Sequence, residues 1–413
     1  MSACLLAALA LALAVAGCGG AGRRSDDSGG RHGTASLVEV YSSLPLRGPA
    51  GAHGRAILGG IRLALQQAGG RAGQYTVSLR SLDDSEPAAG AFGRARVTAN
   101  ARTAAADTRT DLYIGDFDSQ ASATSIPILN EAGVAQISPG STYAGLTVAA
   151  RGTRTGEPQE YYPGGRRTFF RVVPRDAMQA VAGLATMKRD GCTRVAVAND
   201  ERPYGSGLAA TLELDRSRYG VDIVADTGIP SRARLHAYAQ SLKRLGVDCF
   251  YFAGIASPRA VQIAKGVNAE LPKARIVGGD GICTRSYTNP ADGGVPATVA
   301  RRIECTMVVQ SVASYPGGRR FLFAYRARYG AGDPDPYAIY GYEAMKLALD
   351  TIASLGARGN DKAAVLAALR STRSRQSVLG SYGFDANGDT TLRAVGLYRV
   401  DGSGSLRFER AVG

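Results

Sequence analysis

Residues 112–142 read LYIGDFDSQASATSIPILNEAGVAQISPGST and contain a complete strand, turn, helix, strand and turn. Residues 112–114 are a short apolar run that ends at Gly115, and residues 135–138 form a second such run. The residues between them, 119–132, predict a helix. A helix that joins two buried strands is typical of parallel sheets, so this stretch predicts an α/β fold.

The same alternation recurs along the chain in two series. The first covers residues 37–138, and the second runs from near Phe170 to residue 277. We expect strands at residues 37–41, 75–81, 112–114, 135–138, 194–198, 222–226, 250–253 and 275–277, and helices at residues 56–67, 92–105, 119–132, 177–189, 207–219, 235–245, 258–270, 337–355 and 363–370. Two such series predict two lobes, each a doubly wound parallel sheet with helices on both faces. The remaining C-terminal residues are expected to complete both lobes.

The chain opens with an apolar run of Ala, Leu and Val at residues 5–16. This run is too short for a membrane-spanning helix, which needs about 17 to 25 residues, but it matches the core of a signal peptide. It leads into Val15-Ala16-Gly17-Cys18, which resembles the lipobox of bacterial lipoproteins, where the cysteine is acylated and becomes the mature N-terminus.

We therefore expect a signal peptide at residues 1–17, lipidation of Cys18 and a flexible tether at residues 18–35. These features would hold the protein outside the cell, on the outer face of the membrane. A buried apolar helix with an ordinary cysteine is the alternative.

Composition excludes some classes of protein. The chain has 49 Lys and Arg against 35 Asp and Glu, a net charge of +14. Only six of the basic residues are Lys, and the Arg residues are scattered, so a nucleic-acid-binding surface is not expected. No second long apolar run occurs, and we therefore expect no transmembrane segment. The mature chain of about 380 residues is long enough for two domains.

Four cysteines remain after the signal peptide and the lipidation site: Cys192, Cys249, Cys283 and Cys305. An even number in an exported chain predicts disulfides, with three possible connectivities. Cys192 and Cys249 each precede an expected strand, and neighbouring strands would bring them together. This favours the pairs Cys192–Cys249 and Cys283–Cys305. A zinc site is the rival, but the chain has no CxxC pair and only three His.

The strongest sign of an enzyme is GSGLAA at residues 205–210, which fits the G-x-G-x-x-A pattern of dinucleotide sites, with Asp226 about twenty residues further on. Such a site needs its first glycine directly after the strand, whereas residues 199–204 intervene here. The chain has no P-loop, G-x-S-x-G or H-E-x-x-H motif, and its His residues show no triad pattern. We expect no catalysis, no metal and no cofactor.

Binding residues are expected where strands end and helices begin, because ligands of open α/β sheets lie at the carboxyl ends of the strands. Three turns of the first series carry polar groups there: residues 51–54, 116–122 and 138–143. Taken singly, Ser119 and Thr142 read as helix caps, but together at one sheet edge they predict a carboxylate cradle. Tyr204 and Asp280 occupy matching turns of the second series.

Four motifs carry a family resemblance: GPAGAHG at residues 48–54, LDD at 82–84, ISPGST at 137–142 and PYGSGLA at 203–209. In this order and spacing they resemble the leucine/isoleucine/valine-binding group of type I periplasmic solute-binding proteins, which serve ABC transporters. The resemblance runs from about Val38 to the last strands. Residues 161–163 and 169–174 look like an insertion of actinobacterial members. The family fold has two parallel-sheet lobes joined by a three-strand hinge.

The resemblance implies roles for the turns of the first lobe. Ser119 and Thr142 would hold the α-carboxylate of a ligand, with help from the backbone at Gly140, and Ser141 belongs to the same binding turn. His53 stands where branched-chain binders have Trp, so one aromatic wall of the pocket is lost.

The resemblance also implies roles in the second lobe. Asp280 stands where the family has Glu and would pair with the α-ammonium of the ligand, and Tyr204 matches a Tyr that covers the ligand. Ile255 and Ala256 stand where a Tyr is usual. The motif for an amino-acid head group therefore survives better than the motif for its side chain.

We expect chain crossings near residues 171–172, 306–307 and 380–383. They divide the chain into a first lobe of residues 36–171 and 306–382 and a second lobe of residues 172–305 and 383–413. Such a hinge closes when a ligand bridges both lobes. The expected function is that of a monomeric, lipid-anchored receptor that presents an amino acid or similar small ligand to an ABC permease. A sensor of the same fold, an NAD-dependent enzyme and a structural lipoprotein with a degenerate pocket are the alternatives.

Overall fold

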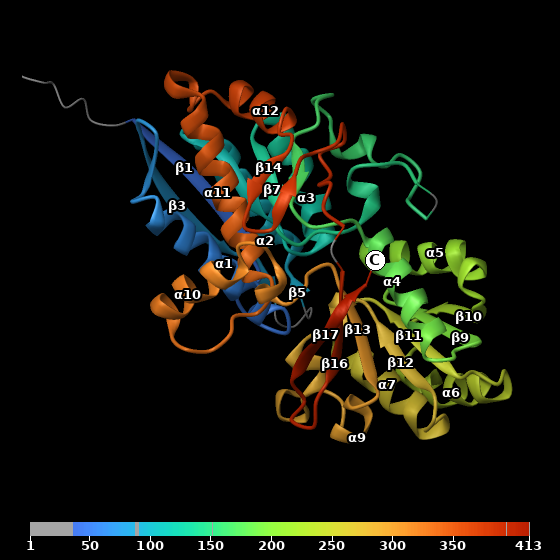
Figure 1. The fold of residues 1–413 in the computed structure, drawn as a ribbon. Helices are drawn as coiled ribbons and strands as arrows, with labels where there is room; N and C mark the ends of the chain where they lie inside the picture. The colour runs from blue at the N-terminus through green and yellow to red at the C-terminus, as the bar shows by residue number, and fades with distance from the viewer. Residues whose placement is uncertain (1–35, 87–90, 151, 394, 413) are drawn as a thin grey trace, which may run out of the picture. The chain divides into compact units, whose positions relative to one another are not determined.

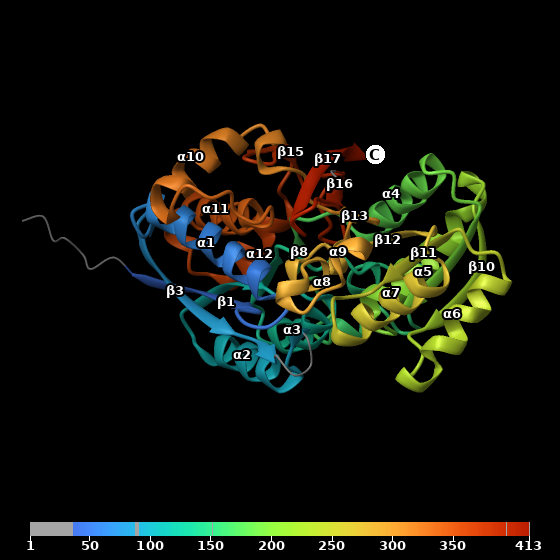
Figure 2. The same ribbon diagram turned by 90° about the horizontal axis from the view of Figure 1, so that it is seen from below.

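The computed structural model describes residues 36–86, 91–150, 152–393 and 395–412. The expected signal peptide, Cys18 and the tether up to residue 35 lie outside these residues. The described chain is built on two large sheets, of six and seven strands, with helices beside them (Figures 1 and 2). Both sheets are predominantly parallel, which confirms the expected α/β class with two lobes. None of the helices in the described ranges has the length and apolar character to span a membrane.

The first sheet has the strand order β2-β3-β1-β6-β7-β8. Its strands are β1 (Leu37–Leu44), β2 (Arg71–Ala72), β3 (Tyr75–Asp83), β6 (Thr110–Gly115), β7 (Ala135–Ser138) and β8 (Phe169–Arg171). All neighbours pair in parallel except β2 and β3. The chain leaves β1 for β3 on one side and returns to β6 on the other, so the strand order reverses between β1 and β6. Ligands of open α/β sheets bind at such a reversal.

Helices cover both faces of this sheet. They are α1 (Gly51–Gln67), α2 (Arg94–Ala106), α3 (Ser119–Glu131), α10 (Gly318–Tyr329), α11 (Ala338–Ser354) and α12 (Lys362–Arg370). α1 and α11 pack together and share a core with Val38 and Val40 of β1. Tyr41 points to the opposite face, where it packs with Ala101 of α2 and Leu129 of α3. Alternate side chains of β1 therefore serve two cores, as expected for a parallel strand covered on both faces.

The second sheet has the order β10-β9-β11-β12-β13-β16-β17. Its strands are β9 (Arg194–Asn199), β10 (Asp222–Gly228), β11 (Cys249–Ala253), β12 (Arg275–Gly278), β13 (Ile303–Met307), β16 (Val395–Val400) and β17 (Leu406–Val412), and its helices include α4 (Asp176–Arg189), α5 (Pro203–Asp215), α6 (Leu235–Arg244), α7 (Pro258–Glu270) and the short α8 (Arg285–Thr288) and α9 (Ala297–Ala300). The first five strands in this order are parallel, and β16 and β17 join them antiparallel.

Both favoured disulfides are present. β9 and β11 are neighbouring parallel strands, and the Cα atoms of Cys192 and Cys249 lie 5.7 Å apart. The Cα atoms of Cys283 and Cys305 lie 5.8 Å apart. Both distances are typical of disulfides, and the connectivity expected from the strand order is confirmed.

The chain passes between the two lobes after β8, after β13 and before β16. β13 belongs wholly to the second sheet, so residues 306–307 lie within that sheet. β14 (Arg375–Ser377) and β15 (Gly380–Tyr382) form a separate hairpin, and the third passage therefore follows Tyr382. The exact lobe boundaries that we expect from the sequence stay a prediction.

The glycines of the G-x-G-x-x-A pattern lie inside α5 rather than in a phosphate-binding loop. A Cβ atom at Gly207 would lie 2.7 Å from the ring of Tyr143, which is closer than real contacts allow. Gly207 therefore permits α5 to approach the Tyr143 side chain closely. The pattern reflects helix packing and not a dinucleotide site.

Candidate ligand-binding site

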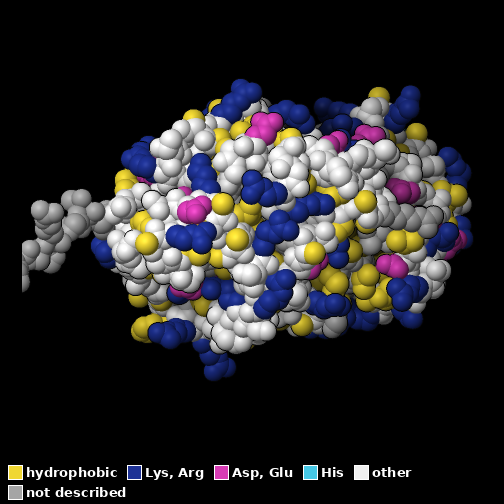
Figure 3. Space-filling view, turned by 90° about the horizontal axis from the view of Figure 1, so that it is seen from above, with side chains coloured by type: hydrophobic (Ala, Val, Ile, Leu, Met, Phe, Trp, Pro, Cys, Tyr) yellow, Lys and Arg dark blue, Asp and Glu magenta, His cyan; other side chains and the backbone are white. Residues whose placement is uncertain are grey.

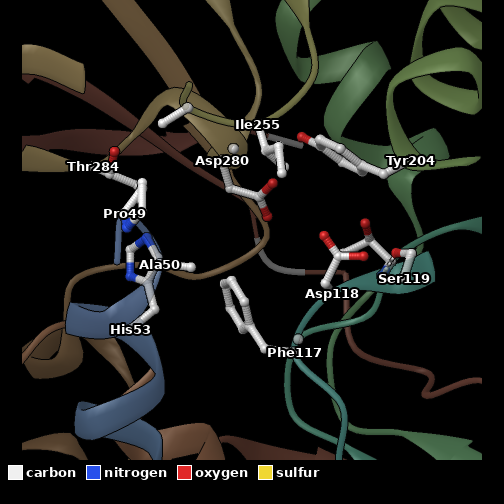
Figure 4. A pocket seen from close by; sticks show the side chains of 14 residues that line it. Pro49, Ala50, His53, Phe117, Asp118, Ser119, Tyr204, Ile255, Asp280 and Thr284 are labelled. Carbon is white, nitrogen blue, oxygen red and sulfur yellow. Dashed lines mark hydrogen bonds between the residues drawn. The ribbon is translucent and has the colours of Figure 1, made fainter. Parts of the chain in front are cut away.

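A pocket lies where turns of both lobes meet (Figure 4). The empty space between these turns is partly open to solvent. Its lining residues are Pro49, Ala50, His53, Phe117, Asp118, Ser119, Gly140, Thr142, Tyr204, Ile255, Ala256, Asp280, Gly281 and Thr284. Every residue expected to bind the ligand is among them except Ser141.

Ser119 links two turns of the first lobe. It is the first residue of α3, and its Oγ accepts hydrogen bonds from the N–H groups of Thr142 and Tyr143, each at 3.2 Å. A hydroxyl that accepts two hydrogen bonds keeps its own proton to donate. Together with the Thr142 hydroxyl, it gives the pocket two O–H donors from the first lobe.

Gly140 and Ser141 shape the turn that follows β7. Their N–H groups donate to Ser138 Oγ at 3.2 and 2.8 Å. Ser141 is fully buried, and its Oγ donates to the carbonyl of Asp116 at 3.0 Å. Ser141 therefore holds the turn in place instead of lining the pocket. At Gly140, a Cβ atom would collide with the ring of Phe117, so glycine is what lets this ring form part of the pocket wall.

Asp118 lines the pocket immediately before α3. Its Oδ1 accepts hydrogen bonds from the N–H groups of Gln120 at 2.7 Å and Ala121 at 3.3 Å, which makes it the N-cap of the helix. Burial raises the pKa of this carboxyl, although the Arg202 guanidinium and the two N–H groups act in the opposite direction.

Asp280 approaches the pocket from the second lobe. The hydroxyl of Tyr337, at the start of α11 in the first lobe, donates to Asp280 Oδ2 at 2.6 Å. Burial raises the pKa of Asp280, and the nearby polar groups of Tyr337, Tyr204 and Gln179 only partly oppose this effect. The Tyr204 hydroxyl donates its proton to Gln179 Oε1 at 2.6 Å. Asp280 is therefore a half-buried carboxyl that accepts a hydrogen bond from the other lobe.

His53 forms another wall of the pocket. Its Nδ1 lies 2.6 Å from Asp335 Oδ2. Burial lowers the pKa of His53, but the Asp335 and Asp280 carboxylates together raise it by more, and the net change is upward. The ring centroid of His53 lies 5.3 Å from that of Phe117 and 5.2 Å from that of Tyr337. The rings of His53, Phe117 and Tyr337 therefore pack together on the side of the pocket where, by the family resemblance, His53 replaces a Trp.

Ile255 and Ala256 line the pocket after β11. The N–H of Ile255 donates to Asp200 Oδ2 at 3.0 Å, and the N–H of Ala256 donates to the carbonyl of Gly281 at 2.8 Å. The Ile255 side chain packs against apolar residues of α2 and α3 in the first lobe. This part of the wall is apolar and touches both lobes.

The sequence did not single out several residues that line this site or support it from behind. Phe117 and Asp118 lie inside the turn at residues 116–122, but an aromatic and an acidic residue in a turn carry no specific signal. Asp335 and Tyr337 precede α11, far from any strand end, and only the fold brings them to His53 and Asp280.

The sequence is similar to that of known binding proteins. The family model described as periplasmic binding protein matches residues 42–405. The chain is 26% identical over 368 residues to Leu/Ile/Val-binding protein homolog 1 of Brucella melitensis biotype 1, with 88% of this chain and 90% of that protein covered.

Solved structures show the same fold. A leucine-binding protein of Thermotoga maritima has a TM-score of 0.74 at 22% identity, with 91% of this chain and 99% of that chain covered. A solute-binding protein of an ABC transporter from R. palustris, in complex with benzoate, has a TM-score of 0.70 at 18% identity, with 91% and 96% covered.

These relatives are named for binding and not for catalysis, in agreement with the expectation that the chain is no enzyme. The family match extends from the first strand of the first sheet to the last hairpin of the second. The chain therefore belongs to the periplasmic binding protein family.

Proposed function

We propose that this protein captures an amino acid or a related small polar ligand outside the cell and delivers it to an ABC importer. One observation carries the proposal: the hydroxyls of Ser119 and Thr142 share a pocket with Asp280 and Tyr204 of the other lobe. A buried ligand carboxylate needs hydrogen-bond donors, and a buried ammonium needs an acidic partner. The two halves of the pocket are complementary to the two halves of an amino-acid head group.

Ligand capture would work by closure of the two lobes. A ligand held from one side by Ser119 and from the other by Asp280 makes all its contacts only when the lobes meet, so binding stabilises the closed state. The hydrogen bond between Tyr337 and Asp280 also joins the lobes and would add to that preference. The permease would then recognise the closed form.

The same proposal includes export and a lipid anchor. Residues 1–17 would be a signal peptide, Cys18 the acylated N-terminus and residues 18–35 the tether. Membership of an extracytoplasmic family and two disulfides support export. A Cys18→Ala variant should no longer partition with membranes, and mass spectrometry of the mature N-terminal peptide should show acyl chains on Cys18.

We propose a small molecule, and not a nucleic acid, as the ligand of a monomeric protein. On the face in Figure 3, Lys and Arg side chains are spread out, with Asp and Glu among them. Nucleic-acid-binding surfaces gather their basic residues into one patch or stripe. The spread of charge therefore agrees with a small-solute receptor.

Thermal unfolding of the purified protein with a panel of small solutes tests the binding function. A ligand at a hundred times its Kd adds about 2.7 kcal/mol of stability. The shift should disappear in the Ser119→Ala and Asp280→Asn variants and persist in Asp333→Asn, a control on an exposed side chain. A folded protein that no solute stabilises would contradict the proposal.

A further inference from the structure

Two carboxyl groups face the pocket from opposite sides. Asp118 belongs to the turn before α3 in the first lobe, and Asp280 follows β12 in the second. Figure 4 shows both side chains directed into the space between the lobes. Among the described residues that line the pocket there is no Lys or Arg. The only basic side chain in that lining is His53, which attracts Asp280 but has its Nδ1 2.6 Å from Asp335 Oδ2.

The two acidic groups have different local partners. Asp118 uses Oδ1 to cap α3, and Arg202 attracts it, yet burial prevails and the pKa of Asp118 is raised. Asp280 binds the Tyr337 hydroxyl through Oδ2, and burial raises its pKa as well. Burial therefore disfavours the ionised form of both carboxyls, although Arg202 attracts Asp118 and His53 attracts Asp280.

On the basis of the proposed function, we propose that the ligand of this site carries a net positive charge and that its cationic groups bind at Asp118 and Asp280. A neutral amino acid has one ammonium group, which Asp280 can pair with. Its carboxylate, at Ser119 and Thr142, would lie beside Asp118. A second cationic group on the ligand removes this conflict, because it gives Asp118 an opposite charge when the closing lobes expel water.

Anionic ligands fit this pocket poorly for the same reason. A carboxylate without an accompanying cation would add a third negative charge to a space that already holds two acidic side chains. Like charges in a buried site oppose one another strongly. The lining residues thus disfavour an aromatic acid, although the rings of His53 and Phe117 line the pocket.

Two matched ligand pairs test the charge directly by isothermal titration calorimetry of the purified protein. L-lysine and L-norleucine differ by one ammonium group on the same side chain, and benzylamine and benzoate carry opposite charges on the same ring. The cationic member of a pair should bind about 10- to 100-fold more tightly, as expected for an added charge-assisted hydrogen bond in a desolvated site. A wider thermal-shift panel of cationic, zwitterionic and anionic solutes covers other shapes.

The Asp118→Asn variant tests the position of the cation. Asn caps helices about as well as Asp, so the fold of α3 should survive, and the preference for the cationic member should fall about tenfold. Asp333→Asn, on an exposed side chain, is the matched control. A cation preference that Asp118→Asn leaves unchanged would overturn the placement of the cation.

The remaining outcomes separate this inference from the proposed function. If solutes stabilise the protein through Ser119 and Asp280 but only neutral or anionic ones do so, the receptor function stands and the charge inference fails. If no solute in the panel binds to folded protein, both fail. Preferential binding of cations that depends on Asp118 and Asp280 supports both.

Discussion

Arg171 forms a buried ion pair with Asp389, with 2.6 Å between Nε and Oδ1, although the two residues are 218 positions apart in the chain. The Arg171 side chain is completely buried. Its Nη1 donates to the carbonyls of Ser141 and Tyr143 at 3.0 and 2.9 Å. One guanidinium therefore connects the end of β8, the turn that carries Thr142 and the chain segment that leads to β16.

Replacement of Arg171 should destabilise the protein strongly. In Arg171→Met, Asp389 stays buried and loses its main partner, which should lower the free energy of unfolding by about 3–5 kcal/mol. Urea denaturation measures this change. The exposed ion pair of Arg407 and Asp401 provides the control, since Arg407→Met should cost less than about 1 kcal/mol.

A double variant tests whether the effect comes from the Asp389 charge, which the more distant Arg175, at 3.5 Å, would only partly compensate. Asp389→Asn added to Arg171→Met removes that charge, so the double variant should be more stable than the sum of the two single changes predicts. Strict additivity would mean that Arg171 acts through packing and its carbonyl contacts alone.

The two disulfides should contribute unequally. They close loops of 57 and 22 residues, for which loop entropy predicts about 4 and about 3 kcal/mol. The Cys192→Ala/Cys249→Ala variant should therefore lose more stability in guanidinium than Cys283→Ala/Cys305→Ala. Reduction of the native protein should reproduce the combined loss, and unchanged stability with four free thiols would refute the prediction.

Asp111 should make the stability depend on pH. Burial raises its pKa to about 7, an effect that nearby Lys362 only reduces, whereas an unfolded Asp has a pKa of about 3.9. The folded state thus holds this proton more tightly than the unfolded state. The contribution of Asp111 to the free energy of unfolding should therefore fall as the pH rises from about 4 to about 7, and it should level off above that.

The Asp111→Asn variant should remove that part of the pH dependence. It should be more stable than the native protein at pH 8, by up to roughly 4 kcal/mol, and similar to it at pH 4. Denaturation at both pH values decides this, with Asp333→Asn as an exposed control. An equal change at both pH values would show that Asp111 acts through its contacts and not through its proton.

The elements that carry the site could be predicted because their signals are local. β7 has the bounds expected from its apolar run, and α3 starts at Ser119 as expected. α10 was missed because only Gly318, Phe321 and Leu322 of this helix are buried, which is too narrow an apolar stripe to give a helical period.

The residues that support His53 and Asp280 could not be predicted for a different reason. His53 and Asp335 lie 282 positions apart, and no local pattern links residues at that separation. The strand-end rule finds turns on one sheet edge, whereas Asp335 and Tyr337 contact the lining residues His53 and Asp280 from the start of a helix that follows the second passage between lobes.

Tyr337 should control the charge of Asp280. Its hydroxyl donates to this carboxyl at 2.6 Å and lowers a pKa that burial raises. In Tyr337→Phe the pKa of Asp280 should rise further, so that less of the carboxylate form is available to bind a cationic group. The affinity for the cationic ligand should fall roughly tenfold near neutral pH. The loss should shrink as the pH rises and Asp280 ionises.

Titration calorimetry across pH 5–9 would measure this pH dependence. The control is Tyr342→Phe, because Tyr342 lies on α11 and its hydroxyl donates to Gln67 of α1. A loss of the same size at every pH would mean that the hydroxyl positions the ligand or the lobes and does not act through the proton on Asp280.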